Sequence, residues 1–323
     1  MKFLEQYARR IDEALDALPL PDQPETLYAP QRYLLDGGGK RFRPVLTLLS
    51  CGLCSGKTED ALPAAVAVEL LHNFTLMHDD IMDQADQRRG RASVHVKWSV
   101  ATAILSGDSM FTQALLQLQK LPDHLHHKSI SNTFLTGINR VCEGQALDME
   151  FETRTDVTTH DYLHMIAGKT GALIACALQM GGQCAVADEA TVERLGELGH
   201  KLGLAFQIQD DLLDVVADPG KFGKKTAGDI VEGKKTYLML LALERCSDSD
   251  AETIRTLLAN TPLTTAQVQQ IIGIYRSCNV LDETAVKINE LYTEACELLE
   301  PFDDSPYKSD LTHVIETLKI REY

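Results

Sequence analysis

The residues in this sequence best suited to chemistry form two acidic clusters of the same type. Asp79-Asp80-Ile81-Met82-Asp83 ends one apolar segment, and Asp210-Asp211-Leu212-Leu213-Asp214 lies in another, far downstream. Both read Asp-Asp-x-x-Asp. Residues four apart lie on one face of an α-helix, so the first and last aspartate of each cluster would point the same way.

Carboxylates at this spacing repel one another and destabilise a helix, and burying them in apolar sequence is costly. A bound cation would relieve both problems, and oxygen ligands favour magnesium or a similar hard ion. One such cluster in an acidic protein is more often a solvated helix face. Two copies on two amphipathic helices favour metal ions held between facing helices, as in helical bundles.

Positive charge gathers near these clusters. Residues 37–44 read Gly-Gly-Gly-Lys-Arg-Phe-Arg-Pro, which combines a glycine turn, three cations and a proline suited to a helix start. Such a segment predicts an anion site more than a solvated basic turn. Arg88-Arg89-Gly90-Arg91 follows the first acidic cluster. It could simply neutralise that cluster, but a second anion site is the sharper interpretation.

Other polar groups in apolar segments are ambiguous from the residues alone. Lys169-Thr170 could be an ordinary surface pair, and Gln207 a core amide or a ligand contact. A lone histidine such as His72 is more often a satisfied core residue. The lysines around Gly228-Asp229 could be solvated, or could clamp a diphosphate beside a carboxylate–metal site; they are Lys224, Lys225, Lys234 and Lys235.

The elements that must position these groups are helices. Apolar residues recur at three- and four-residue steps over residues 62–83, and similar patterns cover most of the chain. The segments are 2–18, 44–55, 97–120, 128–151, 160–181, 188–217, 234–246, 264–277 and 280–299. Glycine and proline fall between these segments. The sequence therefore predicts an all-α fold with one domain over residues 1–323.

The composition excludes several other classes. The chain has 323 residues and a formal net charge of −16, which argues against a nucleic-acid surface and a polybasic membrane anchor. No apolar run approaches the length of a membrane span, and the N-terminus lacks a signal-peptide core. Cys51 and Cys54 read as small buried hydrophobes, and the scattered cysteines favour a cytoplasmic location.

Taken in order, these motifs resemble the trans-polyprenyl diphosphate synthases of the farnesyl and geranylgeranyl type. The resemblance rests on Gly-Gly-Lys-Arg-Phe-Arg-Pro, Asp-Asp-Ile-Met-Asp before Arg-Arg-Gly, Gly-Lys-Thr, and Phe-Gln-Ile-Gln-Asp-Asp-Leu-Leu-Asp, from Gly37 to Lys235. It implies a bundle of long helices around a deep central cavity, normally a homodimer. It also implies magnesium-dependent 1′-4 condensation of isopentenyl diphosphate with dimethylallyl, geranyl or farnesyl diphosphate.

The resemblance also implies the roles of individual residues. Asp79, Asp83 and Asp210 would ligate three magnesium ions, with Asp80, Asp211 and Asp214 in support. The implied contacts to the allylic diphosphate are Arg88, Lys169, Thr170, Gln207, Lys225 and Lys234. Those to isopentenyl diphosphate are Lys40, Arg43, His72 and Arg89.

The family also implies which residues limit product length. A bulky residue five positions before the first motif blocks the growing chain, and this position is Phe74, followed by Thr75. A helical wheel alone puts Thr75 nearer the Asp79 face. The bulk of Phe74 favours a short product, and we expect C15 farnesyl diphosphate before C20 geranylgeranyl diphosphate.

Two alternatives remain. A class I terpene cyclase also ionises a prenyl diphosphate with magnesium, but it has no use for the cations of a second diphosphate site. A non-catalytic subunit of a heteromeric synthase would be expected to have lost acidic motif residues, and this chain keeps both sets.

Overall fold

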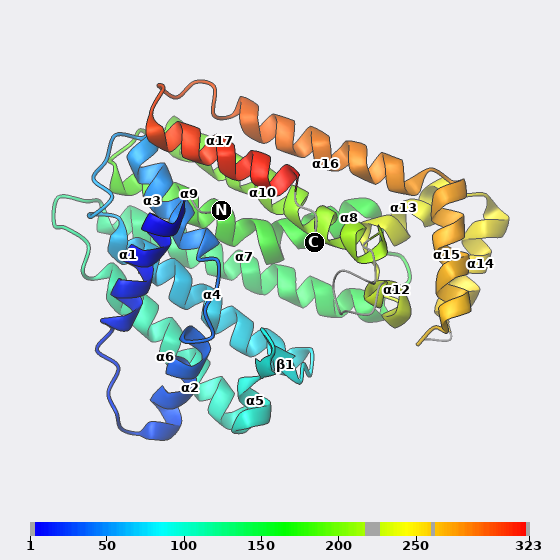
Figure 1. Ribbon diagram of the computed structural model, residues 1–323, viewed down its shortest axis with the longest axis horizontal. Helices are drawn as coiled ribbons and strands as arrows, with labels where there is room; N and C mark the ends of the chain where they lie inside the picture. The colour runs from blue at the N-terminus through cyan, green and yellow to red at the C-terminus, as the bar shows by residue number, and fades with distance from the viewer. Residues whose placement is uncertain (1–3, 217–226, 260–261, 321–323) are drawn as a thin grey trace. The chain divides into compact units, whose positions relative to one another are not determined.

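The computed structural model describes residues 4–216, 227–259 and 262–320, and in these ranges the regular structure is helical apart from one short hairpin (Figure 1). The chain divides into two compact units. Unit 1 comprises Met1–Ile138, Cys176–Gly196 and Phe302–Leu311, and unit 2 comprises Asn139–Ala175, Glu197–Pro301 and Thr312–Tyr323. The predicted all-α fold is confirmed. The single domain and the central cavity stay predictions.

Unit 1 carries the first acidic cluster and both arginine-rich motifs. Its elements in chain order are α1 (Glu5–Asp16), α2 (Glu25–Leu35), α3 (Phe42–Leu53), α4 (Leu62–Met82), β1 (Gln87–Arg88), β2 (Arg91–Ala92), α5 (Val94–Lys97), α6 (Val100–Leu118) and the first part of α7 (His127–Thr153). It also includes parts of α9 (Ala172–Cys184), α10 (Glu189–Val216) and α17 (Pro306–Lys319).

The core of unit 1 forms around α4, which packs on α3 and α6. Buried residues on α4 include Val66, Leu70 and Met77, which share one helical face at steps of four and seven residues. A proline in the first turn suits the start of α4, and Asp83 is its C-cap. The first acidic cluster therefore lies at the end of a helix whose opposite end is anchored in apolar packing.

Unit 2 carries the second acidic cluster on α10. Its other elements are the rest of α7, α8 (Thr159–Ile166), the π-helical turn η2 (Ala167–Gly171), α12 (Gly228–Glu232), α13 (Tyr237–Arg245), α14 (Asp248–Leu258), α15 (Thr265–Ser277), α16 (Val280–Glu297) and the end of α17. Side-chain caps begin several of these helices: Thr158 and Thr264 form capping boxes with Asp161 and Gln267.

The sequence pattern missed several elements. Helix α2 contains Pro30, and α14 buries only Ala251 and Ile254, so neither gives a clear apolar period. The β1–β2 hairpin is too short for an alternating pattern, and η2 interrupts the predicted helix 160–181. That stretch, Thr159–Cys184, is long and apolar enough to cross a membrane by length and composition, but 67% of its apolar window is buried, as in a core helix.

The cysteines behave in two ways. Cys51 is buried as predicted, and burial raises its pKa to about 12; Cys54, the C-cap of α3, is partly exposed, and its pKa rises to about 11. Cys246 and Cys278, at the C-caps of α13 and α15, form a disulfide that the scattered spacing did not predict.

Candidate active site

The first acidic cluster is held in place by an arginine. Asp80 is 1% exposed, and Arg88 donates to its Oδ1 from Nε at 2.7 Å and from Nη2 at 2.6 Å. Arg88 Nη2 also lies 3.7 Å from Asp79 Oδ2. Asp79 is half-buried and Asp83 is exposed. Asp80 is therefore turned inward and fixed, which leaves Asp79 and Asp83 as the more accessible carboxylates of the cluster.

A two-residue turn begins directly after Arg88 and contains the second arginine of the motif. Strands β1 and β2 pair Arg88 with Arg91, and Arg89 and Gly90 form the turn with φ of 53° and 72°. Positive φ at both positions is the type I′ geometry that suits a tight hairpin. Adjacent arginines consequently face different groups. Arg88 faces the acidic cluster, whereas Arg89 Nη1 donates to the carbonyl of Gly38.

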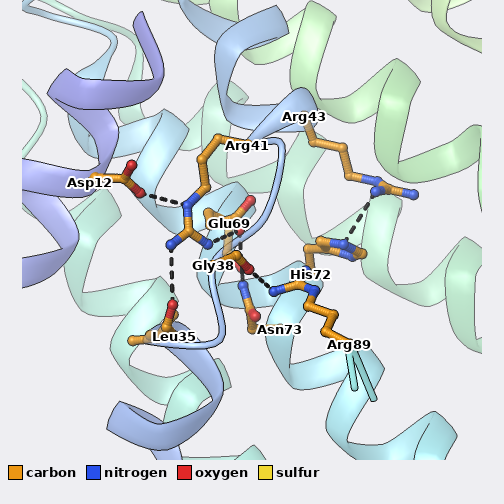
Figure 2. A network of polar contacts seen from close by, with 9 residues as sticks. All are labelled: Asp12, Leu35, Gly38, Arg41, Arg43, Glu69, His72, Asn73 and Arg89. Atoms are coloured by element: carbon orange, nitrogen blue, oxygen red, sulfur yellow. Dashed lines mark hydrogen bonds and ion pairs between the residues drawn. The ribbon is translucent and has the colours of Figure 1, made fainter. Parts of the chain in front are cut away.

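The glycine-rich segment receives Arg89. A Cβ added at Gly39 would lie 3.1 Å from Arg89 Nη2, so the guanidinium rests against bare backbone. Lys40 is exposed at the end of this segment. Arg43 Nη1 lies 3.3 Å from His72 Nε2 (Figure 2). Unit 1 thus brings together all four residues predicted for isopentenyl diphosphate: Lys40 and Arg43 from the segment before and within α3, His72 from α4, and Arg89 from the hairpin.

His72 is neutral in this setting. Burial lowers its pKa well below the usual value, and the charges of Arg43 and Arg89 lower it further. A neutral imidazole Nε2 can accept the hydrogen bond that Arg43 donates. His72 therefore orients a guanidinium without adding a charge that would repel it.

Aromatic side chains lie one to two turns before the first cluster. The Phe74 ring is 4.6 Å from the His78 ring and 5.6 Å from that of Phe111 on α6, and Phe111 stacks at 6.5 Å on the fully buried Phe134 of α7. The Thr75 hydroxyl donates within its own helix, to the carbonyl of His72. Phe74 thus belongs to a layered aromatic cluster, of which the sequence had indicated only the first member.

The buried aspartate of the second acidic cluster is held by neutral donors. Asp211 is 3% exposed and accepts hydrogen bonds from Tyr162 Oη at 2.5 Å, Gln207 Nε2 at 3.3 Å and the Tyr237 amide at 3.3 Å. Burial raises the pKa of Asp211 to about 7. Asp210, one position earlier, is partly exposed. The second aspartate is again the inward one.

Asp214 has a different task. Its Oδ1 accepts from the Gly228 amide at 3.2 Å and its Oδ2 from the Asp229 amide at 3.1 Å, so it caps the first turn of α12. Burial raises the pKa of Asp229, an effect that Lys234 opposes. The charge of Lys234 also favours the ionised form of Asp211, so Lys234 lies close enough to the second cluster to interact with it electrostatically.

Two of the predicted allylic residues of unit 2, Lys169 and Thr170, lie on η2, and a third, Gln207, lies on α10. The Thr170 hydroxyl donates to Gln207 Oε1 at 3.0 Å, and Lys169 Nζ lies 2.5 Å from Asp148 Oδ2. Glycines allow this approach: a Cβ at Gly168 would lie 2.9 Å from the carbonyl of Arg140, and one at Gly144 would meet the Lys169 amide. Lys225 lies outside the described residues.

Several contact residues escaped the sequence reasoning. Tyr162 and the Tyr237 amide hold Asp211 from elements remote in sequence, and no local pattern marks them. Arg41 was noted only as one of three loop cations. It instead pairs with Asp12 and Glu69, at 2.7 Å each. Glu69 is a lone charge in the apolar run of α4, a signal that could have been used.

The carboxylates suit a magnesium ion that is shared with substrate. In the described ranges, no three His, Cys, Asp or Glu side chains converge closely enough to hold a metal ion. Magnesium is usually bound through one or two carboxylates, waters and substrate phosphates rather than by a protein cage. Among the described residues, the buried Oδ2 of Asp80 has no hydrogen-bond partner, an acceptor that a metal-bound water could satisfy.

Comparison with known proteins now decides the family. The polyprenyl synthetase family model matches residues 24–275. The chain belongs to this family. It is 36% identical over 321 residues to the geranylgeranyl diphosphate synthase of Methanosarcina mazei, covering 99% of this chain and 97% of the relative. It is 34% identical over 331 residues to the geranylfarnesyl diphosphate synthase of Natronomonas pharaonis, covering 97% and 95%.

Solved structures of other polyprenyl synthetases share the fold. The geranylgeranyl pyrophosphate synthetase of Pyrococcus horikoshii superposes with a TM-score of 0.93 at 34% identity, over 99% of this chain and 98% of that one. A polyprenyl synthase of Caulobacter crescentus, complexed with calcium and isoprenyl diphosphate, has a TM-score of 0.84 at 27% identity, over 98% and 94%. The chain is a prenyltransferase, and the comparisons support a short-chain prenyl diphosphate synthase.

Proposed function

We propose that this polyprenyl synthetase condenses isopentenyl diphosphate 1′-4 with allylic diphosphates to give an all-trans C20 product, geranylgeranyl diphosphate. The expectation of C15 as the first choice finds no support among the relatives, since those of Methanosarcina mazei and Pyrococcus horikoshii are named for geranylgeranyl diphosphate. The bulk of Phe74 indicated a limit to growth, but residue size alone does not give the depth available to the chain.

The proposal of a two-substrate condensation rests on the different contacts of Arg88 and Arg89 in the β1–β2 hairpin. Arg88 faces carboxylates suited to a metal ion, whereas Arg89 donates to the Gly38 carbonyl and lies near enough to Arg43 and His72 for both arginines to act on His72 by charge. Two diphosphates bound in two different ways need such a pair. A terpene cyclase binds one diphosphate and would leave Lys40, Arg43 and Arg89 without a function.

Each set of residues has a distinct proposed task. Asp79, Asp83 and Asp210 would hold magnesium, which supplies charge stabilisation to the departing diphosphate. Arg88, Lys169, Thr170, Gln207 and Lys234 would bind the allylic diphosphate, with Lys225 proposed from the sequence alone. Lys40, Arg43, His72 and Arg89 would bind isopentenyl diphosphate. Asp80, Asp211 and Asp214 position neighbouring groups.

The reaction balances without a protein nucleophile. The allylic C1–O bond breaks with its electron pair leaving on the diphosphate, and the isopentenyl double bond attacks C1. A proton then leaves C2 of the former isopentenyl unit, and the departed diphosphate can accept it. The protein's task is to bind both diphosphates, align the two carbons and exclude water from the cation.

The test is product analysis. Purified protein is incubated with isopentenyl diphosphate, magnesium and, separately, dimethylallyl, geranyl or farnesyl diphosphate, and the products are separated by chain length. We expect a magnesium-dependent C20 diphosphate. A C15 product would restore the other chain length, a hydrocarbon from the allylic substrate alone would indicate a cyclase, and no product would favour a non-catalytic subunit. The homodimer and the cytoplasmic location remain proposals.

A further inference from the structure

Arg41 is the cation of the glycine-rich segment whose guanidinium is buried. It is 6% exposed and adopts a left-handed backbone conformation with φ of 46°, which residues other than glycine rarely adopt. Its guanidinium donates to Asp12 Oδ1 at 2.7 Å, to Glu69 Oε1 at 2.7 Å and to the Leu35 carbonyl at 3.2 Å (Figure 2). Every nitrogen of the guanidinium has a partner within the protein, so Arg41 is not arranged to bind a substrate.

Glu69 links Arg41 to α4. It is 2% exposed and also accepts from Asn73 Nδ2 at 3.1 Å. His72 lies one turn after Glu69 on the same helix. The Arg41–Glu69 pair therefore fixes the glycine-rich segment to the turn of α4 that presents His72.

The position of Arg41 in the chain explains how the Arg41–Glu69 ion pair can position its neighbours. Arg41 is the N-cap of α3, directly after Lys40 and two residues before Arg43. Its backbone conformation sets where Lys40 leaves the loop and where Arg43 enters the helix. A buried ion pair with several hydrogen bonds is a rigid reference point, since breaking it would leave a buried charge without a partner.

Glu69 also acts on the neighbouring cations through its charge. It favours the charged forms of Arg43 and Arg89, against the effect of their burial. Arg41, Arg43, Arg88 and Arg89 all act on His72, so these positive charges are concentrated in one small volume. A buried anion behind them reduces their mutual repulsion while the exposed side stays positive.

We propose that Arg41 and Glu69 are positioning residues for isopentenyl diphosphate: a buried clamp that holds Lys40, Arg43 and His72 in place without touching the substrate. The inference rests on the proposed function, because it assumes that these three residues receive that diphosphate. Asp12 supports the clamp from α1, and its half-exposed carboxylate is the less important partner.

The experiment compares four variants with the wild type. Arg41→Gln breaks the clamp, and Arg41→Lys keeps the charge but cannot bridge Asp12 and Glu69 as a guanidinium does. The double variant Arg41→Gln/Glu69→Gln removes both charges, so it provides a folded test if the single variant does not fold. Arg10→Gln is the matched control, because Arg10 on α1 bonds only Thr58 and Glu59 among the described contacts.

The primary readout is calorimetric titration with isopentenyl diphosphate without added metal, followed by KM for each substrate with magnesium. We expect Arg41→Gln and the double variant to weaken isopentenyl diphosphate binding about tenfold, or about 1.4 kcal/mol, and to raise its KM similarly. The KM for the allylic substrate should not change. Arg41→Lys should recover part of the loss, and Arg10→Gln should match the wild type.

The outcomes separate the two proposals. Unchanged isopentenyl diphosphate affinity in the folded double variant would overturn the clamp, as would equal weakening of both substrates, which indicates general loss of structure. A wild type that does not bind isopentenyl diphosphate also overturns it. A wild type that binds but forms no product refutes the proposed function, and the variant affinities still decide the clamp.

Discussion

The two Asp-Asp-x-x-Asp clusters have the same sequence pattern but different supports. In the first, the buried Asp80 is paired with the guanidinium of Arg88. In the second, the buried Asp211 is held by a tyrosine hydroxyl, an amide side chain and a backbone amide, and its pKa rises to about 7. The second aspartate is the buried one in both clusters, whereas the last aspartate is exposed in the first cluster and caps α12 in the second.

This difference has a consequence for ligands. The first cluster already contains one cation that is also a proposed diphosphate ligand, so a metal ion there shares its carboxylates with Arg88. The second cluster has no guanidinium among its described hydrogen-bond donors, and Lys234 acts on it through its charge. The buried aspartate therefore has a charged donor in the first cluster and neutral donors in the second. Four predictions test or refine the comparison.

The largest effect should come from the outward aspartates. Asp79→Asn and Asp210→Asn each remove a charge proposed to hold magnesium, and we expect kcat to fall by about 10²–10³-fold, the usual loss for one element of charge stabilisation. Steady-state kinetics over a magnesium series measures it. Glu197→Gln, an exposed change on α10, is the control. Loss in only one of the two aspartate variants would mean that the clusters do not share the task.

The inward aspartates should differ in stability. Arg88→Gln leaves the buried Asp80 carboxylate unpaired, and we expect a loss of about 3 kcal/mol in the free energy of unfolding, the low end for a broken buried pair because Arg88 is partly exposed. Tyr162→Phe removes one neutral donor from Asp211, at about 1–2 kcal/mol. Urea unfolding measures both.

The double variant Asp80→Asn/Arg88→Gln is the control for that comparison. It removes the charge that Arg88→Gln leaves behind and should regain part of the stability. Equal losses for Arg88→Gln and Tyr162→Phe would show that the charge of the donor is unimportant at these two sites.

A smaller effect should follow loss of a cation in unit 2. Lys169→Gln removes a proposed allylic diphosphate contact, and we expect KM for the allylic substrate to rise about tenfold with less change in KM for isopentenyl diphosphate. Lys201→Gln is the matched control, since Lys201 also forms a 2.5 Å ion pair, with Glu294, but is not proposed to bind substrate. The same KM change in both variants would contradict a specific role for Lys169.

The smallest effect, in rate, should come from the aromatic residue before the first cluster. Phe74→Ala shortens the side chain whose ring lies 5.6 Å from that of Phe111, and we expect products at least one C5 unit longer at a similar rate. The second cluster has Ala205 at the equivalent position, so this function belongs to the first cluster alone. Leu76→Ala on α4 is the control. An unchanged product length would remove Phe74 from the account.

Local sequence predicted the features that depend on neighbours along the chain. The helical period of α4 and the spacing of Asp79 and Asp83 follow from three- and four-residue steps, as does the position of Asp210 on α10. The Arg-Arg-Gly motif lies beside the first cluster, where Arg88 pairs with Asp80 and Arg89 donates to the Gly38 carbonyl. Its role as a second anion site stays a prediction.

The remaining contacts depend on residues far apart in sequence. Tyr162 reaches Asp211 over 49 positions, and Arg41 reaches Glu69 over 28. No period or motif records such a pair, because it exists only once helices pack. The left-handed backbone at Arg41 was hidden for the same reason: the contacts that stabilise it come from α1 and α4.

In the β1–β2 hairpin of unit 1, the number of residues matters more than the identity of most of them. Arg88 and Arg89 face different groups because a two-residue turn begins at Arg89. Inserting or deleting one residue in the Arg89–Gly90 turn would shift the β1–β2 register and change which arginine faces the carboxylates. During evolution this segment should accept substitutions at many positions but few insertions or deletions. Its length should therefore be better conserved than its sequence.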